Sequence, residues 1–414
     1  MRDRFAVAVT VALSTLVVLV AAAPLAGAAV VGAPADASGS SAAGVGTSAS
    51  AVAGATTGGT TSLHQEGARQ CAEGTASYPL QVEDNTSTTV TIEEEPETVV
   101  TLGPSAAQTM WELDAEDEVV GVTQFAAYLE GAEERTNVST PQFGSYDTEA
   151  IVSLDPDVVL APNVVFDDSV STLRDAGITV YKFDPATSIK DIQQKTLLTG
   201  ALVGECEAAR ETNRWVSENL DAASEAVGDR ESVRALYVSF GQTTGAGTFT
   251  HSMIGASGAT NVVSEAGEEG YIFPVNEELV VQQDPEWLVV TPGTDTARAP
   301  YNQTTAVEEG NVVVVDNNWL NQPAPRSVVF AVRNMTEAFH GDAYGPENYV
   351  SRSEATRTPT PTSTTTTGTT TDTTADETTA ATTGPDDGQS QPGLGAVVAV
   401  VALLGALALL RRRD

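Results

Sequence analysis

Basic residues are scarce in this sequence. Lysine and arginine total 20 against 56 aspartate and glutamate residues, the net charge is −36, and only Lys182, Lys190 and Lys195 are lysines. A nucleic-acid site needs a basic patch that neutralises phosphates, so nucleic acid is excluded as a partner. Self-repulsion of this size loosens a folded chain in dilute buffer, whereas multimolar salt shortens the screening length to below about 3 Å. We infer a halophilic protein.

Histidine and cysteine are also scarce. The three histidines are His64, His251 and His340, and the two cysteines are Cys71 and Cys206. A bare-metal site needs several histidines, cysteines or carboxylates in one place, so we predict no metal and no cofactor. In an exported chain the even cysteine count predicts one disulfide, with two free thiols as the alternative.

Catalytic motifs are missing as well. The sequence has no G-x-S-x-G elbow and no phosphate-binding loop, and Gly245-Ala246-Gly247 lacks the dinucleotide-binding spacing. We therefore predict that the protein is not an enzyme.

The N-terminal segment has the pattern of a signal peptide. Residues 1–29 begin with Arg2 and Arg4, continue with an apolar run that Pro24 interrupts, and end in small residues. A charged start, an apolar middle and small residues before cleavage are typical of export signals, and the proline disfavours an uncleaved anchor. Residues 30–75 follow as a linker rich in Ala, Gly, Ser and Thr, which we expect to be disordered.

The C-terminal segment has the pattern of a membrane anchor. Residues 346–391 are rich in Thr and predict an extended stalk. Residues 392–414 contain an uncharged apolar run, Leu394 to Leu410, and end in three arginines and an aspartate. That run spans about 25 Å as a helix, and the arginines direct the C-terminus inward. We therefore expect a globular part on the extracellular face of the membrane. Four glycosylation sequons fit this location: Asn85, Asn137, Asn302 and Asn334.

One segment of the chain occurs twice. Residues 149–157 read E-A-I-V-S-L-D-P-D and residues 278–286 read E-L-V-V-Q-Q-D-P-E, at an offset of 278 − 149 = 129. Each copy predicts a short helix, an Asp-Pro turn and a buried strand. A second repeated pattern follows, because residues 180–184 and 312–316 are both strand-like runs that end in Asp. Two copies of one α/β lobe imply a ligand cleft between them.

Strand and helix patterns alternate through the central part of the chain. We predict an α/β fold with an N-terminal lobe over 76–186, one long connecting helix over 187–229 capped by Ser188, and a C-terminal lobe over 230–345. Such alternation favours mainly parallel sheets. The predicted strands are 99–102, 119–122, 158–160, 179–183, 233–240, 288–291 and 312–316, and the predicted helices include 105–113 (capped by Ser105), 168–175 and 326–340.

These elements resemble a known family. Val100 to Leu113, the Asp155-Pro156-Asp157 turn, Ala186 to Ile189 and Pro323 to Arg326 are similar to the iron-siderophore and vitamin B12 class of substrate-binding proteins of ABC importers. The resemblance covers about residues 97–340. It implies two α/β lobes joined by a long helix, with a corrinoid or a ferric-siderophore chelate in the cleft. Pro392-Gly393-Leu394 and the terminal arginines also resemble the archaeal PGF-CTERM sorting tail, which an archaeosortase replaces with a lipid.

The resemblance also implies ligand contacts in loops that follow the strands. Aromatic walls and a few polar groups suit a flat macrocycle or a chelate. The predicted ligand-binding residues are Tyr128, Phe143, Asn163, Phe249, Phe273, Asn318, Trp319 and Arg326. Ordinary core packing is the alternative for each aromatic residue. For Arg326 the alternative is a structural role, because an arginine at a helix N-terminus faces the wrong end of the dipole and needs another partner.

Glu149 and Glu278 are the predicted docking residues. In the family one exposed glutamate per lobe meets arginines of the permease dimer, and these two occupy the matching helix starts. A symmetric pair of carboxylates suits a twofold partner. Glutamates favoured by the helix dipole are the alternative. Two other functions are the alternatives: a surface structural or adhesion protein, which leaves the duplicated lobes unexplained, and a haem or bare-metal binder.

We predict that the protein loses structure when it is dialysed from multimolar to low salt, because unscreened carboxylates then repel one another. Far-ultraviolet circular dichroism measures this loss. An unchanged spectrum at low salt contradicts the inference of a halophilic protein.

Overall fold

The computed structural model describes residues 63–142 and 144–356. The predicted signal peptide, most of the predicted stalk and the predicted C-terminal anchor lie outside these residues. Among the described residues, no helix is both long and apolar enough to cross a membrane.

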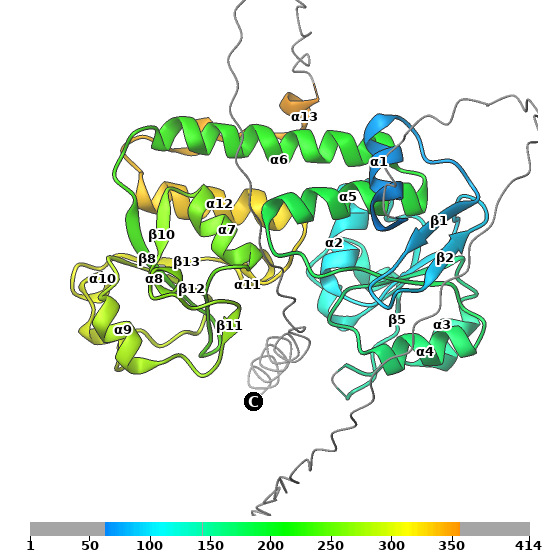
Figure 1. The fold of residues 1–414 in the computed structure, drawn as a ribbon, viewed down its shortest axis with the longest axis horizontal. Coiled ribbons are helices and arrows are strands. Elements are labelled where there is room, and N and C mark those ends of the chain that lie inside the picture. Colours follow the sequence, from blue (N-terminus) through cyan, green and yellow to red (C-terminus); the bar gives the residue numbers. More distant parts are fainter. Residues whose placement is uncertain (1–62, 143, 357–414) are drawn as a thin grey trace, which may run out of the picture. The chain divides into compact units, whose positions relative to one another are not determined.

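The N-terminal lobe contains a five-stranded sheet in which all strands are parallel (Figure 1). The strand order is β5-β4-β3-β6-β7. Apolar residues dominate the central strands, and every residue of β6 is buried, as expected for a sheet covered on both faces. The strands are β3 (Val99–Thr101), β4 (Val119–Val122), β5 (Thr136–Asn137), β6 (Val158–Ala161) and β7 (Val180–Lys182).

Helices α2 (Pro104–Glu112), α3 (Thr148–Ser153) and α4 (Asp167–Asp175) connect these strands. The predicted Ser105 cap of α2 is wrong. The helix starts at Pro104 with Gly103 as its N-cap. Proline suits the first turn of a helix, because the missing N–H has no partner there in any case.

An antiparallel hairpin, which the sequence patterns did not predict, precedes this sheet. It consists of β1 (Leu80–Glu83) and β2 (Thr89–Ile92). The fully buried carboxylate of Asp84 accepts hydrogen bonds from Thr86 N (2.8 Å) and Lys182 N (3.2 Å), and it pairs with Arg174 of α4. Burial alone raises the pKa of Asp84, but the hydrogen bonds from Thr86 and Arg174 outweigh burial and lower it. This buried acid fastens the hairpin to the lobe.

The C-terminal lobe repeats the arrangement with four parallel strands in the order β10-β8-β12-β13. In this order β10, β8, β12 and β13 take the places of β4, β3, β6 and β7. The strands are β8 (Val233–Val238), β10 (Ala259–Asn261), β12 (Trp287–Val290) and β13 (Val312–Val314), with a small antiparallel pair, β9 (Thr243–Thr244) and β11 (Tyr271–Ile272), beside them. The helices are α7 (Phe249–Ala256), α8 (Val262–Glu265), α9 (Glu277–Gln283), α10 (Thr305–Glu308), α11 (Asn317–Leu320) and α12 (Pro325–Phe339). The prediction of two similar lobes with mainly parallel sheets is confirmed.

The duplicated segment has the same structure in both lobes. Asp155 and Asp284 end their helices with positive φ angles of 48° and 40°. After the proline, the carboxylate of Asp157 accepts from Thr98 N at 2.9 Å, and that of Glu286 accepts from Arg234 N at 2.8 Å. Each acid thus holds the start of the neighbouring parallel strand. The repeated sequence therefore forms equivalent hydrogen bonds in both lobes.

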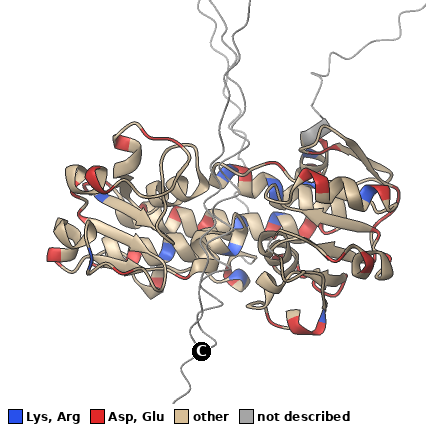
Figure 2. Cartoon of the chain, turned by 90° about the horizontal axis from the view of Figure 1, so that it is seen from below, with Lys and Arg blue, Asp and Glu red and all other residues tan. Residues whose placement is uncertain are grey.

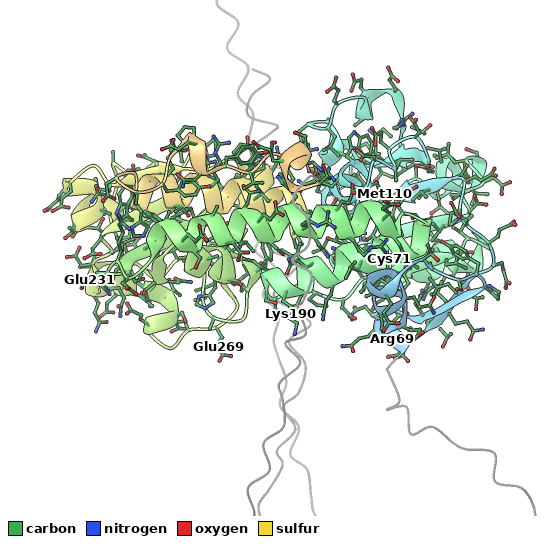
Figure 3. The ribbon with its side chains drawn as sticks, turned by 90° about the horizontal axis from the view of Figure 1, so that it is seen from above. Arg69, Cys71, Met110, Lys190, Glu231 and Glu269 are labelled. Atoms are coloured by element: carbon green, nitrogen blue, oxygen red, sulfur yellow. A yellow bond between two sulfur atoms is a disulfide. The ribbon has the colours of Figure 1, made fainter. Side chains whose placement is uncertain are left out.

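The connection between the lobes is helical, but it is two helices rather than one. Helix α5 (Ile189–Val203) ends at Gly204, whose φ of 87° favours glycine, and α6 (Cys206–Val227) follows. Ser188 caps α5 as predicted, by accepting from Asp191 N. The first turn of α5 packs in the core of the C-terminal lobe and its last turn in that of the N-terminal lobe, whereas α6 runs the opposite way. The helices therefore form a hairpin that crosses both lobes (Figures 1 and 3).

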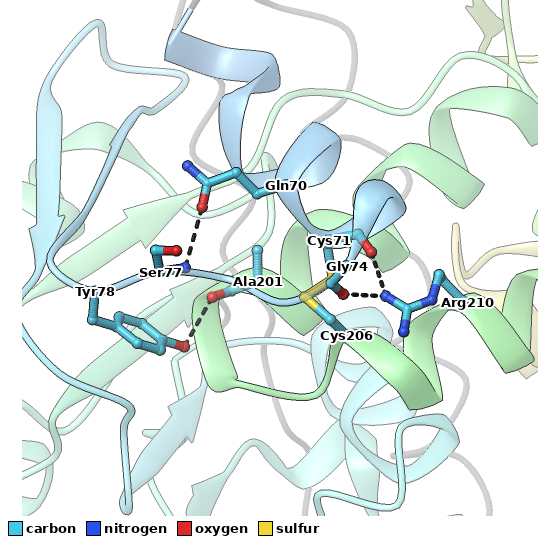
Figure 4. The surroundings of a disulfide bond; sticks show 8 residues. All are labelled: Gln70, Cys71, Gly74, Ser77, Tyr78, Ala201, Cys206 and Arg210. Atoms are coloured by element: carbon cyan, nitrogen blue, oxygen red, sulfur yellow. Dashed lines mark hydrogen bonds between the residues drawn. A yellow bond between two sulfur atoms is a disulfide. The ribbon is translucent and has the colours of Figure 1, made fainter.

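Helix α1 (Leu63–Glu73) lies within the segment predicted to be a disordered linker. It packs on α5, where Gly67 permits close approach, since a Cβ there would lie 2.8 Å from Leu198 Cδ1. The Cys71–Cys206 disulfide, which the even cysteine count predicts, ties α1 to α6, and Arg210 donates to the carbonyl of Cys71 at 2.6 Å (Figure 4). The folded part therefore begins before residue 75.

The folded part also ends later than predicted. After residue 345 the chain forms the short helices η4 (Pro346–Asn348) and α13 (Arg352–Ala355). Trp215 and Asn219 of α6 both donate to the Val350 carbonyl at 2.9 Å, and Val350 N donates back to Asn219 at 3.1 Å. The first part of the predicted stalk is therefore packed against the connecting helices.

A buried carboxylate joins the two lobes. Glu112 of α2 is 1% exposed, and it pairs with Arg326 of α12 and with Arg352 of α13, the latter at 2.8 Å. The Glu112 carbonyl also accepts from Thr212 of α6 at 2.7 Å. A buried charge is tolerated only when it is paired and hydrogen-bonded. The structure thus places three elements from the second half of the chain around one acid of the first half.

Replacing Glu112 by Gln is expected to lower the free energy of unfolding by about 3 kcal/mol, because Arg326 and Arg352 then lack a counter-charge in a partly buried site. Both arginines are about one-third exposed, which keeps the expected loss at the low end of the usual range for broken buried pairs. Urea unfolding at constant salt measures the change. The exposed Glu133→Gln serves as the control and should change the stability by less than about 0.5 kcal/mol. Equal stabilities of the two variants contradict this role of Glu112.

Candidate functional site

The carboxyl ends of the parallel strands carry four of the eight predicted ligand residues. Tyr128 follows β4, Asn163 follows β6, and Asn318 and Trp319 follow β13. In open α/β sheets, ligands bind outside the carboxyl ends of the strands. Both sheets are parallel, so each presents these loops at one edge. The candidate site is therefore built from the loops of both lobes.

A chain of hydrogen bonds links the two sets of loops. Gln108 of α2 donates from Nε2 to the Tyr128 hydroxyl at 2.8 Å, and its Oε1 accepts from both N and Oγ of Ser327 at 3.1 Å. Ser327 Oγ is also 3.0 Å from the carbonyl oxygen of Asn318. Two predicted ligand residues from different lobes, Tyr128 and Asn318, are therefore connected through Gln108 and Ser327.

Tyr128 is positioned to donate a hydrogen bond. Its ring packs against the core of the N-terminal lobe, and burial raises the pKa of its phenol to about 12, so the hydroxyl keeps its proton at neutral pH. Because the oxygen already accepts from Gln108, the hydroxyl hydrogen is the part left to meet a ligand acceptor.

Polar side chains satisfy one another at the carboxyl edge of the second sheet. The Tyr237 hydroxyl donates to Asn321 Oδ1 at 2.6 Å, and Asn321 Nδ2 donates to Ser239 Oγ at 3.3 Å. Ser239 Oγ in turn lies 3.0 Å from Thr291 Oγ1. These residues come from the ends of β8 and β12 and from α11. Because these side chains are hydrogen-bonded to one another, they hold each other in place and are not free donors for a ligand.

Aromatic side chains lie on loops after strands of both lobes and on helices α6 and α12. The ring of Trp319 lies 5.0 Å from that of Phe330, which in turn lies 6.1 Å from that of Trp215. Phe273 beside β11 and Phe166 after β6 are 50% and 47% exposed. Exposed aromatic side chains on loops at strand ends offer apolar surface to a ligand.

Two predicted ligand residues are placed differently from the rest, and a third is not described. Phe249 begins α7, is 6% exposed and packs in the core of the C-terminal lobe. Its ring therefore has a role in core packing, which was the alternative to ligand binding. Arg326 has the partner that its helix position required, and that partner is Glu112. Phe143 lies outside the described residues. The described residues contain no cluster of three or more histidine, cysteine, aspartate or glutamate side chains suited to a metal ion.

The interlobe residues Gln108, Glu112 and Ser327 were not predicted. Gln108 and Glu112 lie in α2, of which every residue from Ser105 to Glu112 is buried. A buried polar side chain needs a partner, and two long polar side chains four residues apart, among apolar residues of one helix, were the signal available in the sequence.

Two surface hollows lie apart from these residues. One, of about 390 Å³, is lined by α1, α5 and residues 183–186. It includes Lys195, which lies over the Phe183 ring at 5.0 Å, and burial lowers the pKa of its amine to about 8. The other, of about 460 Å³, lies beside α9 and is lined by Glu277, Glu278, Val281, Gln282, Pro300 and Gln303.

Glu149 and Glu278 lie exposed in the first turns of α3 and α9. The caps of these helices are fixed, since Asp147 accepts from Ala150 N at 2.9 Å and Asn276 accepts from Glu278 N at 3.1 Å. Neither glutamate is needed as a cap. Acidic residues are spread over both lobes (Figure 2), so position rather than charge distinguishes these two.

Comparisons with known proteins agree with this architecture. Residues 99–318 match the family of periplasmic binding proteins. A cobalamin-binding protein of Halobacterium salinarum is 40% identical over 301 residues, covering 70% of this chain and 80% of the relative. An uncharacterised ABC transporter substrate-binding lipoprotein of Bacillus subtilis, YvrC, is 25% identical over 64% of this chain and 87% of its own length.

Among solved structures, the periplasmic haem-binding protein RhuT from Roseiflexus sp. RS-1 in apo form superposes with a TM-score of 0.53. It is 21% identical, and the match covers 58% of this chain and 98% of that structure. An identity this low shows the fold alone. Together with the family match over more than half of the chain, these findings show that the chain belongs to the periplasmic binding protein family and is a substrate-binding protein, not an enzyme.

Proposed function

We propose that this protein binds a corrinoid of the vitamin B12 type and delivers it to an ABC importer. The observation that carries the proposal is its 40% identity to the cobalamin-binding protein of Halobacterium salinarum over 80% of that protein's length. The Bacillus subtilis relative supports the importer, because it is described as an ABC transporter substrate-binding protein.

The candidate site is compatible with a flat, amide-rich macrocycle. Phe273, which is half exposed, offers aromatic surface from the second lobe, and Trp319 lies partly buried against Phe330 directly after β13. Tyr128 offers a neutral hydroxyl donor from the first lobe, and the side chains of Asn163 and Asn318 are only partly buried. We propose these five residues as ligand contacts, and we assign Arg326 and Phe249 to the structure of the lobes.

The other ligands considered are a ferric siderophore, haem and a bare metal ion. The haem-binding structure shares only the fold, so it gives no preference for haem. A bare metal needs a ligand cluster, which the described residues do not offer. A role limited to surface adhesion does not account for the two lobes and their interlobe contacts. The corrinoid is therefore the favoured ligand.

We further propose that the protein is exported and anchored at the extracellular face of the membrane. The pattern of residues 1–29 supports export, and the apolar run with terminal arginines in residues 392–414 supports an anchor. Mass spectrometry of the mature protein distinguishes a retained tail from one exchanged for a lipid, as in PGF-CTERM proteins.

Glu149 and Glu278 are proposed to dock the protein onto the permease dimer. They occupy equivalent positions in the duplicated segment and are exposed on the first turns of equivalent helices. A pair of carboxylates related by the pseudo-twofold symmetry of the lobes suits arginines related by the true twofold axis of a permease.

Titration with cobalamin is expected to quench the tryptophan fluorescence of the full chain saturably in multimolar salt, whereas haem and ferric siderophores should not. Trp319 lies at the candidate site, so Trp319→Phe should remove much of the quenching. Trp287 packs against Phe339 at the other end of its strand, so Trp287→Phe is the matched control. Free tryptophan amide corrects for light absorption by the corrinoid. Saturable quenching by haem or a siderophore but not by cobalamin contradicts the proposed ligand.

Charge reversal at both docking positions, Glu149→Lys with Glu278→Lys, is expected to abolish uptake of labelled cobalamin while leaving ligand affinity unchanged. Like charges would then face the permease arginines. The exposed pair Glu133→Lys with Glu309→Lys adds the same charge elsewhere on both lobes and should leave uptake intact. Normal uptake by the docking variant rules out this role of the two glutamates.

A further inference from the structure

Two exposed valines occupy equivalent positions in the duplicated segment. Val152 of α3 and Val281 of α9 are 41% and 45% exposed, and they are 281 − 152 = 129 residues apart, the offset of the repeat. Exposed large apolar side chains are few among the described residues: Val152, Val164, Phe166, Phe273, Val281 and Val314. Two of the six therefore mark the same site on both lobes.

Each valine lies beside a proposed docking glutamate. Glu149 precedes Val152 by three residues, and Glu278 precedes Val281 by three. Residues three apart on a helix are neighbours on its surface, with Cβ atoms about 5–6 Å apart. Each lobe therefore presents one carboxylate and one apolar side chain together.

Core packing does not account for these valines. The preceding residues, Ile151 and Val280, are fully buried and already anchor each helix to its lobe. A β-branched residue is also a weak choice for an exposed helix position. A single exposed apolar residue is ordinary, but the same exposed residue in both copies of a surface helix points to a shared contact.

High salt changes what a docking surface needs. At about 1 M salt the screening length is about 3 Å, so exposed carboxylates attract a basic partner only at contact distance. Apolar contact is not screened, and strongly hydrated salts strengthen it. A protein adapted to multimolar salt therefore gains more from an apolar contact beside each carboxylate than from the carboxylate alone.

We propose that Val152 and Val281 form the apolar half of a twofold docking surface that receives one arginine side chain of the permease on each lobe. This proposal rests on the proposed docking role of Glu149 and Glu278. Arginine suits both halves, because its methylene stem packs on an apolar surface while its guanidinium binds a carboxylate in a bidentate manner.

The surface beside α9 contains a hollow that could contact the proposed arginine side chain of the permease. The hollow of about 460 Å³ next to Glu278 includes Val281 and Pro300 as apolar walls and the glutamate carboxylates and the amides of Gln282 and Gln303 as polar groups. Its lining matches a side chain with an apolar stem and a cationic end. The second lobe thus provides a shallow surface hollow whose lining suits an arginine, in addition to the paired valine and glutamate.

The test compares uptake of labelled cobalamin by cells that lack the native gene and carry full-length variants at equal surface amounts. Val152→Ser with Val281→Ser removes the apolar contact, and valine and serine have similar helix propensities. Uptake below half-saturation is expected to fall about tenfold, the effect of leaving the remaining apolar surface of two valines unburied. Ligand affinity, measured by fluorescence titration, should not change. Val314→Ser, at a 57% exposed valine on β13, is the matched control and should take up cobalamin normally.

The outcomes separate this proposal from the proposed function. Reduced uptake with unchanged affinity supports the apolar contact. Normal uptake by the serine variant, while the double glutamate reversal abolishes uptake, overturns the role of the valines and retains the docking role of the glutamates. Normal uptake by both variants overturns both roles. Absence of cobalamin uptake by the wild-type protein contradicts the proposed function and this proposal with it.

Discussion

The ion pairs of Glu112 with Arg326 and Arg352 hold together parts of the chain that are more than 200 residues apart (214 and 240 residues). One turn before Glu112 on the same helix, Gln108 binds Ser327 next to Arg326. The lobes therefore meet along a single face of α2, in a fixed register. Removing one member of such a buried set leaves the other charges without partners, which makes an alternative register costly. These buried contacts therefore fix how the two lobes are placed relative to each other.

The same contact fixes the side chains of the candidate site. Gln108 orients the Tyr128 hydroxyl with one end of its amide and binds the start of α12 with the other. The helical hairpin of α5 and α6 crosses both lobes and packs into both cores. Two helices that run in opposite directions resist hinge motion better than a single strand would. Such a connection favours small movements of the lobes over wide domain closure.

Much of the fold followed from the sequence, because its signals are local. The β-branched runs predicted the central strands to within one or two residues in most cases, and the Asp-Pro-acid turns predicted the duplicated lobes. The errors concern elements whose stability comes from distant partners. The β1–β2 hairpin depends on Asp84 and Arg174, α1 depends on a disulfide and on packing against α5, and α13 depends on Glu112. These segments are short, so their local patterns are weaker signals than those of the central strands.

The sequence by itself determined the class of protein: its surface charge, its paired lobes, its parallel strands and the family that they resemble. These follow from composition, periodicity and the spacing of a repeat. Only the tertiary structure decided which side chains meet. In the folded chain Phe249 is buried in a core, and Arg326 forms an ion pair with Glu112. Hydrogen bonds through Gln108 and Ser327 connect Tyr128 to Asn318. Contacts between residues far apart in the chain depend on how elements pack against one another, and no local pattern records that packing.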